Sequence, residues 1–161
     1  MNSSNKFLQQ VNNRFKFNLF IFLKLPSAFF CGVRVRFADE NKCITTVPFK
    51  WLSQNPFKSI YFACLSMAAE MSTGILAMAH IYQRKPAVSM LVLNVKGEFI
   101  KKAVGRTTFT CEDGGQIKNI IEEAIASGEG KAITVRSTGR NAENEIVAEF
   151  EITWSFKARK A

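Results

Sequence analysis

Apolar and polar positions along the chain predict six strands and three helices. Apolar residues at helical spacing indicate an amphipathic helix over residues 5–23, which Pro26 ends. Alternating positions indicate a strand over residues 31–37 and a second strand over residues 43–49. The polar turn at residues 39–41 is expected to join these two strands as a hairpin.

A long apolar segment follows the hairpin. Ser59 to Ala79 holds one charge, Glu70, in 21 residues. The segment is long enough to span a bilayer, but an acidic group near its middle costs about 2.5 to 3.5 kcal/mol on insertion scales. It is also rich in Ser, Thr, Ala and Gly. We therefore predict a central helix over about residues 57–82 that is buried within the protein, and no transmembrane segment.

The remainder of the chain predicts four more strands with one short helix among them. Residues 87–99 are nearly continuous in apolar side chains, which is typical of a strand covered on both faces. Strands are also expected over 106–111, 132–138 and 145–157, and a helix over about 115–127. This order of elements predicts an α+β fold in which an antiparallel sheet curls around the long helix.

Composition and charge add limits on size and partners. The 161 residues, 47% of them hydrophobic, fit a single domain over residues 1–161 with a sizeable core. The net charge of +9 attracts anions, but no basic helix carries interleaved aromatic residues, so we expect no nucleic-acid partner. Four widely spaced cysteines and one histidine predict no metal site and a cytoplasmic protein with reduced thiols.

Residues 55–63, followed by Glu70, carry a family resemblance. The stretch Asn-Pro-Phe-Lys-Ser-Ile-Tyr-Phe-Ala resembles the central-helix signature of hotdog thioesterases of the phenylacetyl-CoA type. That signature is Asn, two residues, Gly, two residues, His-Gly-Gly, and an acidic residue seven positions later. Asn55 and Glu70 occupy its first and last positions with the spacing kept. Residues 99–103, Phe-Ile-Lys-Lys-Ala, resemble a turn between two strands of the same fold.

The resemblance implies a hotdog fold of about six antiparallel strands wrapped around the central helix, and it covers roughly residues 30–157. The nearest fit is an uncharacterised thioesterase-like branch of unknown function, whose members share the Asn-Pro start, the Glu and the following Gly, here Gly74. The chain departs from the thioesterase signature at Lys58, Tyr61 and residues 62–63, which replace its Gly, His and Gly-Gly.

The resemblance also implies catalytic roles. Thioester hydrolysis needs a base or nucleophile near the carbonyl carbon and hydrogen-bond donors for the developing oxyanion. By resemblance, Glu70 activates water or attacks directly, across a dimer interface from the backbone N–H groups of Phe62 and Ala63 in the other chain. Asn55 would orient Glu70 or the water, and Thr73, one turn beyond Glu70, could share that role.

Further residues are candidates for binding the substrate, namely Ser59, Tyr61, Ala63, Lys101, Lys102 and Arg106. Each assignment has a structural alternative. Glu70 could be a buried carboxylate satisfied by neighbouring donors, and Asn55 before Pro56 is a common residue at the start of a helix. Tyr61 and Phe62 also fit a core or a pocket wall, and the three basic residues also fit solvated turns.

Three functions therefore remain open. The first is an acyl-CoA thioesterase for medium, long or aryl acyl thioesters, carried by CoA or a carrier protein, with no cofactor beyond the CoA of the substrate. It would act as a dimer or a dimer of dimers, because a lone sheet would expose the apolar strand at 87–95. The second is a non-catalytic module that binds acyl-CoA or lipid, which the loss of His-Gly-Gly favours. The third is a basic membrane-associated protein, based on the Phe-rich residues 15–30 and the charge of +9.

Overall fold

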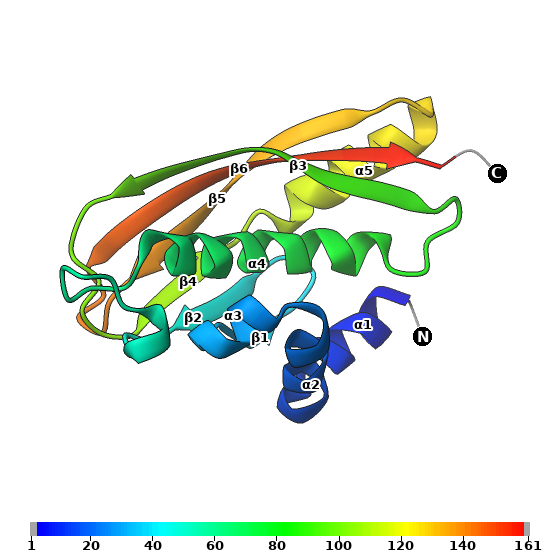
Figure 1. Ribbon diagram of the computed structural model, residues 1–161. Helices are drawn as coiled ribbons and strands as arrows, with labels where there is room; N and C mark the ends of the chain where they lie inside the picture. The colour runs from blue at the N-terminus through cyan, green and yellow to red at the C-terminus, as the bar shows by residue number, and fades with distance from the viewer. Residues whose placement is uncertain (1–2, 160–161) are drawn as a thin grey trace.

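The computed structural model describes residues 3–159, and Met1, Asn2, Lys160 and Ala161 lie outside the described residues (Figure 1). In chain order its elements are α1 (Ser3–Asn12), α2 (Arg14–Lys24), α3 (Pro26–Cys31), β1 (Arg34–Ala38), β2 (Cys43–Val47), the short 3-10 helix η1 (Trp51–Ser53), α4 (Phe62–Ile81), β3 (Val88–Phe99), β4 (Thr107–Cys111), α5 (Gly114–Ser127), β5 (Lys131–Arg140) and β6 (Ile146–Ala158).

The six strands form one antiparallel sheet in the order β1-β2-β4-β5-β6-β3. In Figure 1 the sheet curves over and behind α4, while α1, α2 and α3 lie along the lower side of the molecule. The predicted α+β arrangement, a long helix wrapped by a curved sheet, is confirmed. Among the described residues α4 is the one helix long and apolar enough to cross a membrane, and 67% of its most apolar stretch is buried in the protein. Its burial against the sheet makes α4 the core helix.

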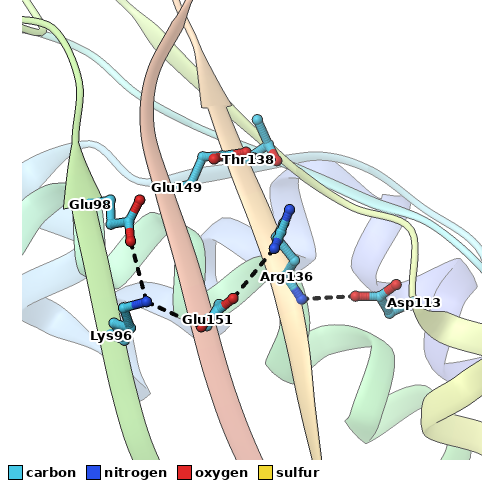
Figure 2. A network of polar contacts seen from close by, with 7 residues as sticks. All are labelled: Lys96, Glu98, Asp113, Arg136, Thr138, Glu149 and Glu151. Atoms are coloured by element: carbon cyan, nitrogen blue, oxygen red, sulfur yellow. Dashed lines mark hydrogen bonds and ion pairs between the residues drawn. The ribbon is translucent and has the colours of Figure 1, made fainter.

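β6 shows the alternation that its sequence predicts. Phe150 and Ile152 are buried in the core, while Glu151 lies on the opposite face of the sheet. On that outer face Glu151 lies 3.7 Å from Lys96 Nζ on β3 and 3.3 Å from an Arg136 guanidinium nitrogen on β5 (Figure 2). Exposed pairs of this kind each contribute at most about 1 kcal/mol. The outer face around Lys96, Glu151 and Arg136 is therefore charged and solvated.

The N-terminal segment forms two helices where the sequence predicts one over residues 5–23. The chain breaks at Asn13, whose side chain accepts a hydrogen bond from Lys16 N–H and so caps α2. The preceding Asn12 is tied to β1, because its side chain donates to Ala38 C=O (2.8 Å) and accepts from Ala38 N–H (3.0 Å). A contact between residues 26 positions apart thus decides where α1 ends.

The first strand also begins later than predicted. Pro26 occupies the first turn of a further helix, α3, where proline is favoured. β1 consequently starts at Arg34 rather than at Cys31. A bulge between Val35 and Phe37 interrupts the expected alternation and leaves Phe37 exposed.

β3 lies at the edge of the sheet and pairs only with β6. Leu91, Leu93 and Val95 on β3 are exposed, so the prediction that both faces of this strand are covered is wrong for the single chain. By contrast, β4, α5, β5 and β6 begin and end within two residues of the predicted ranges.

Candidate functional site

The candidate site begins in the loop of residues 54–61, part of which was predicted to be helical. The side chain of Asn55 closes a tight turn in this loop. Its Oδ1 accepts hydrogen bonds from the N–H groups of Phe57 (3.0 Å) and Ser59 (3.2 Å), and its Nδ2 donates to Ser59 Oγ (3.0 Å). Asn55 therefore shapes the loop that precedes α4.

The 54–61 loop sets the first residue of α4. Lys58 has a left-handed φ of 57°, which a right-handed helix does not allow. Tyr61 N–H then donates to Ser53 C=O (2.8 Å) and anchors the end of the loop on η1. α4 begins at Phe62, five residues after the predicted start at 57.

The first turn of α4 has free backbone donors. Tyr61, in the position before the helix, has extended backbone angles and makes no side-chain capping hydrogen bond. Among the described residues, the N–H groups of Phe62 and Ala63 have no acceptor. Such groups, together with the dipole of a 20-residue helix, attract negative charge. Both predicted oxyanion donors are therefore available for a ligand.

A cavity of about 580 Å³ opens at this helix start. The rings of Tyr61 and Phe62 lie 4.7 Å apart, and those of Phe62 and Phe99 lie 6.4 Å apart, so aromatic groups form much of its wall. The lining comes from the 54–61 loop, the first turns of α4, and the turn after β3, namely Asn55, Pro56, Phe57, Ser59, Ile60, Tyr61, Phe62, Leu65, Phe99, Ile100, Lys101, Lys102 and Ala103. Its volume and apolar walls fit a small organic ligand or an acyl chain.

The predicted binding residues divide into two groups. Ser59, Tyr61, Lys101 and Lys102 line the cavity, whereas Ala63 and Arg106 do not. Lys101 Nζ forms an ion pair with Glu145 Oε1 (2.6 Å). Lys102 Nζ donates to Phe57 C=O (3.3 Å) and has no acidic partner within residues 3–159. Lys102 is therefore the cation at the cavity whose charge remains available to an anionic ligand.

Glu70 lies two turns further along α4, half-buried beside Gly74 and Trp154. A Cβ on Gly74 would lie 3.2 Å from Glu70 Oε1 and 3.3 Å from Trp154 Cζ2, so glycine leaves room for the carboxylate there. Burial raises the pKa of the Glu70 carboxyl, and no hydrogen bond or charge from the described residues opposes this shift. A half-buried carboxylate of this kind is suited to accept a proton closer to neutral pH than an ordinary glutamate.

Thr73 acts on the surroundings of Glu70 rather than on its carboxylate. Thr73 Oγ1 accepts a hydrogen bond from Trp154 Nε1 (2.9 Å) and donates to Glu70 C=O (2.9 Å). It therefore orients the indole that lies next to the carboxylate. The Asn55 side chain is engaged within its own loop. Neither Thr73 nor Asn55 therefore forms a hydrogen bond with the Glu70 carboxylate of the same chain.

Glu70 and the start of α4 are separate within one chain. The eight residue steps from Phe62 to Glu70 span about 12 Å along the helix axis. Glu70 does not line the cavity. Its neighbour Trp154 pairs with Val92, which places Glu70 near β6 and the edge strand β3.

Several cavity residues were not predicted as site residues. Phe57, Leu65, Phe99 and Ile100 supply apolar wall, and three of them are exposed in the chain. The signal available in the sequence was the Phe-Ile-Lys-Lys-Ala turn, which places two apolar side chains directly before two lysines.

Neither metal binding nor a cysteine nucleophile is supported at this site. Residues 3–159 contain no cluster of three or more His, Cys, Asp or Glu side chains that could hold a metal ion. Cys64 lies near the start of α4, with its Sγ 3.4 Å from Cys31 Sγ. Burial and the neighbouring Cys31 thiol raise the pKa of Cys64 to about 12, so it is protonated and poorly nucleophilic at neutral pH.

Comparisons with known proteins bear on the fold of this chain. Among solved structures, a protein of unknown function from Chlorobaculum tepidum is 18% identical, with a TM-score of 0.75 over 97% of this chain and 94% of that one. A thioesterase from Haemophilus influenzae is 14% identical, with a TM-score of 0.65 over 91% of each chain. A Pseudomonas aeruginosa protein called a "probable thioesterase" is 16% identical, with a TM-score of 0.72 over 97% and 96% of the two chains. At these identities the likeness shows the fold.

Family membership follows from the sequence itself. No curated protein matches the chain. A family model described as Domain of unknown function (DUF4442) matches residues 16–156, which is most of the chain. The chain therefore belongs to the DUF4442 family and has the hotdog fold of thioesterase-like proteins.

Proposed function

We propose that this protein hydrolyses acyl thioesters such as acyl-CoA and that it does so as a dimer. The observation that carries the proposal is the uncapped start of α4, where two N–H groups are free and Phe62, which bears one of them, lines an apolar cavity together with two lysines. Such a site offers donors for an oxyanion, space for an acyl chain and a cation for a phosphate.

The chemistry would begin with the carbonyl oxygen of the thioester at the N–H groups of Phe62 and Ala63. Glu70 takes a proton from water as the water oxygen attacks the carbonyl carbon, and the resulting oxyanion accepts the two N–H hydrogen bonds. The C–S bond then breaks, and the leaving sulfur receives the proton held by Glu70. The products are a carboxylic acid and a thiol. The raised pKa of Glu70 suits both proton transfers.

A dimer is part of this proposal because the two halves of the machinery lie about 12 Å apart along one helix. One chain would supply Glu70 and the partner chain the start of its own α4. The location of Glu70 near the open edge strand β3 supports this arrangement, because a second chain can approach along that edge.

The cavity suggests the class of acyl group and its carrier. Aromatic walls from Phe57, Phe62 and Phe99 favour medium, long or aryl acyl groups over small polar ones. Lys102 would contact a phosphate of CoA or of a carrier-protein prosthetic arm, while the charge of Lys101 is offset by Glu145. No cofactor beyond this part of the substrate is required.

A second candidate is a non-catalytic module that binds acyl-CoA or lipid. It is favoured by the exposed Phe62 ring at the helix start, where the resembled signature has glycine, and by Asn55, whose side chain is engaged within the 54–61 loop. Both features preserve a binding cavity while reducing the groups free to act on a carbonyl.

A thiol-release assay over acyl-CoA esters of increasing chain length separates the two candidates. The thioesterase proposal expects turnover that Glu70→Gln lowers by about 100-fold or more, with folding and mass unchanged. Glu123→Gln, an exposed carboxylate on α5, is the matched control and should retain full activity. Absence of turnover on every ester, with acyl-CoA still raising the melting temperature, would support the binding module instead.

The backbone donor can be tested separately at Phe62. Proline is favoured at the first position of a helix, and Tyr61 has the extended angles (φ −64°, ψ 136°) that a following proline requires. Phe62→Pro therefore removes one N–H with little expected loss of stability and should lower turnover by about 100-fold or more. Phe62→Ala removes the same ring but keeps the N–H, so its turnover should exceed that of Phe62→Pro by about 100-fold or more. Equal activity in these two variants would exclude the Phe62 N–H as an oxyanion donor.

A further inference from the structure

The helix α2 has an apolar face that its own chain leaves uncovered. Phe17 and Ile21 are its buried residues, and they face the core. Phe15, Leu19, Phe22 and Leu23 lie on the opposite side by helical spacing, and all four are exposed, Phe15 to 81% and Leu23 to 64%. A helix that is apolar on both sides has one face without a partner.

The neighbouring elements extend this surface. Phe22 contacts Phe29 (5.1 Å between ring centroids) and Phe30 (6.1 Å) on α3. η1 is tied to α3 because Cys31 Sγ donates to Leu52 C=O (3.3 Å), and it carries Trp51, which is 80% exposed. Figure 1 places α2 and α3 together along the lower side of the molecule. The α2–α3 surface is defined here by Phe15, Leu19, Phe22, Leu23, Phe30 and Trp51.

Positive charge borders the α2–α3 surface. Lys16 lies on the same side of α2 as Leu23 by helical spacing and forms no ion pair among the described residues. Arg34 stacks on the Phe29 ring (4.4 Å), and Lys50 lies over Gly32 at the end of α3. Residues 1–69 hold nine basic and two acidic side chains, which is +7 of the net charge of +9, and residues 1–38 hold no acidic side chain.

This charge pattern selects the partner. A second copy docking through the same surface would bring Lys16, Arg34 and Lys50 close to the same residues of the other copy, and residues 1–38 offer no acidic side chain to oppose them, which is unfavourable. An anionic lipid surface satisfies both features, because its headgroups attract the cations while Phe, Leu and Trp side chains enter the interface. We infer that the α2–α3 surface docks this protein on anionic membranes, independently of whether it hydrolyses thioesters.

The test is co-sedimentation of the full chain with vesicles of phosphatidylcholine, with and without phosphatidylglycerol. The wild type should sediment with the anionic vesicles, and added salt should weaken this binding. Phe15→Ser with Leu23→Ser should weaken it about tenfold or more, because two exposed apolar side chains are lost without a change in charge. Lys16→Glu with Lys50→Glu should abolish the preference for phosphatidylglycerol.

Matched controls keep the test specific to this surface. Val104→Ser removes an exposed apolar side chain elsewhere, and Lys118→Glu with Lys131→Glu makes the same change in charge on α5 and β5. Both should bind vesicles as the wild type does. The inference is overturned if the wild type does not sediment with anionic vesicles, or if the controls lose binding as strongly as the variants of the α2–α3 surface. It is also overturned if the serine variant instead converts an oligomer to a monomer in vesicle-free solution.

Discussion

Lys58 occupies a backbone conformation that suits glycine better than lysine. Its φ of 57° lies in the left-handed region, which costs a side chain with a Cβ about 1 to 2 kcal/mol. The thioesterase signature that this stretch resembles has glycine at the same position. The conformation is kept here by the Asn55 turn, since Lys58 N–H donates to Asn55 C=O (3.2 Å). A glycine at this position would adopt the same backbone conformation without that strain.

Lys58→Gly should therefore raise the free energy of unfolding by about 0.5 kcal/mol, since relief of strain exceeds the larger unfolded-state entropy of glycine. Denaturant unfolding measures the change. Lys118→Gly within α5 is the matched control and should lower stability by about 1 kcal/mol, because its backbone is helical. Destabilisation by Lys58→Gly as well would mean that the lysine side chain makes a contact worth more than the strain.

Glu70 predicts a pH dependence with a defined sign. Burial raises the pKa of its carboxyl in the folded protein above that in the unfolded chain, so the protonated form favours folding. This contribution is present below the unfolded pKa and is lost as pH rises through the folded pKa. Glu70→Gln removes it and should be more stable than the wild type near neutral pH and about equally stable near pH 4. Urea unfolding of both proteins across this range checks the prediction, and a constant difference would contradict it.

At the scale of elements, α5 is fitted closely against the turn between β1 and β2. Gly114 begins α5, and a Cβ there would lie 2.2 Å from Glu40 C=O and 2.6 Å from Asn41 Cα. These are backbone atoms that cannot move aside as a flexible side chain can. The adjacent Gly115 has open space, since a Cβ there would meet only Asn41 Oδ1 at 3.9 Å.

Gly114→Ala is accordingly expected to lower the free energy of unfolding by about 2 kcal/mol through overpacking. Gly115→Ala introduces the same methyl group one residue later and should leave stability unchanged or slightly increased. Thermal and denaturant unfolding of the two variants make the comparison. Equal effects from both would show that helix propensity, rather than the contact with the β1–β2 turn, governs this position.

Whether an element could be predicted depends on how local its signal in the sequence is. β6 and α4 were predictable because alternation and continuous apolar composition persist over many residues. The break between α1 and α2 was not, because it depends on Asn12 reaching Ala38. The start of α4 was missed for a similar reason, since the Asn55 turn and the φ of Lys58 override an otherwise helical composition.

The candidate site was predictable to the same extent. Two polar residues that were selected as candidates, Ser59 and Lys102, line the cavity, whereas Glu70, selected by resemblance, does not line it within one chain. The apolar wall could not be predicted, because Phe57 and Phe99 become neighbours of the helix start only through the fold. The exclusion of Ala63 and Arg106 from the cavity lining likewise depends on side-chain direction, which spacing alone does not give.

At the scale of the whole molecule, the edge strand β3 remains open. It is 12 residues long, its exposed apolar residues include Leu91 and Val95, and its unpaired edge is free to hydrogen-bond another strand. The outer face beside it carries the charges of Lys96, Glu151 and Arg136 (Figure 2). Pairing along the edge is therefore favoured over packing of one sheet face on another. We expect two copies to join through β3, which also explains why its apolar sequence suggested burial.

A shared site makes a specific prediction for mixed dimers. Glu70→Gln and Phe62→Pro should each be nearly inactive alone, because one lacks the base and the other lacks an oxyanion donor. If each site combines Glu70 of one chain with the start of α4 of its partner, a mixed dimer holds one intact site and one site with both defects. Unfolding the two variants together and refolding them makes half of the dimers mixed. This should restore about a quarter of wild-type thiol release, because each mixed dimer has one working site of two. If the refolded mixture has a dimeric mass but does not regain thiol release, Glu70 and its oxyanion donor lie in the same chain.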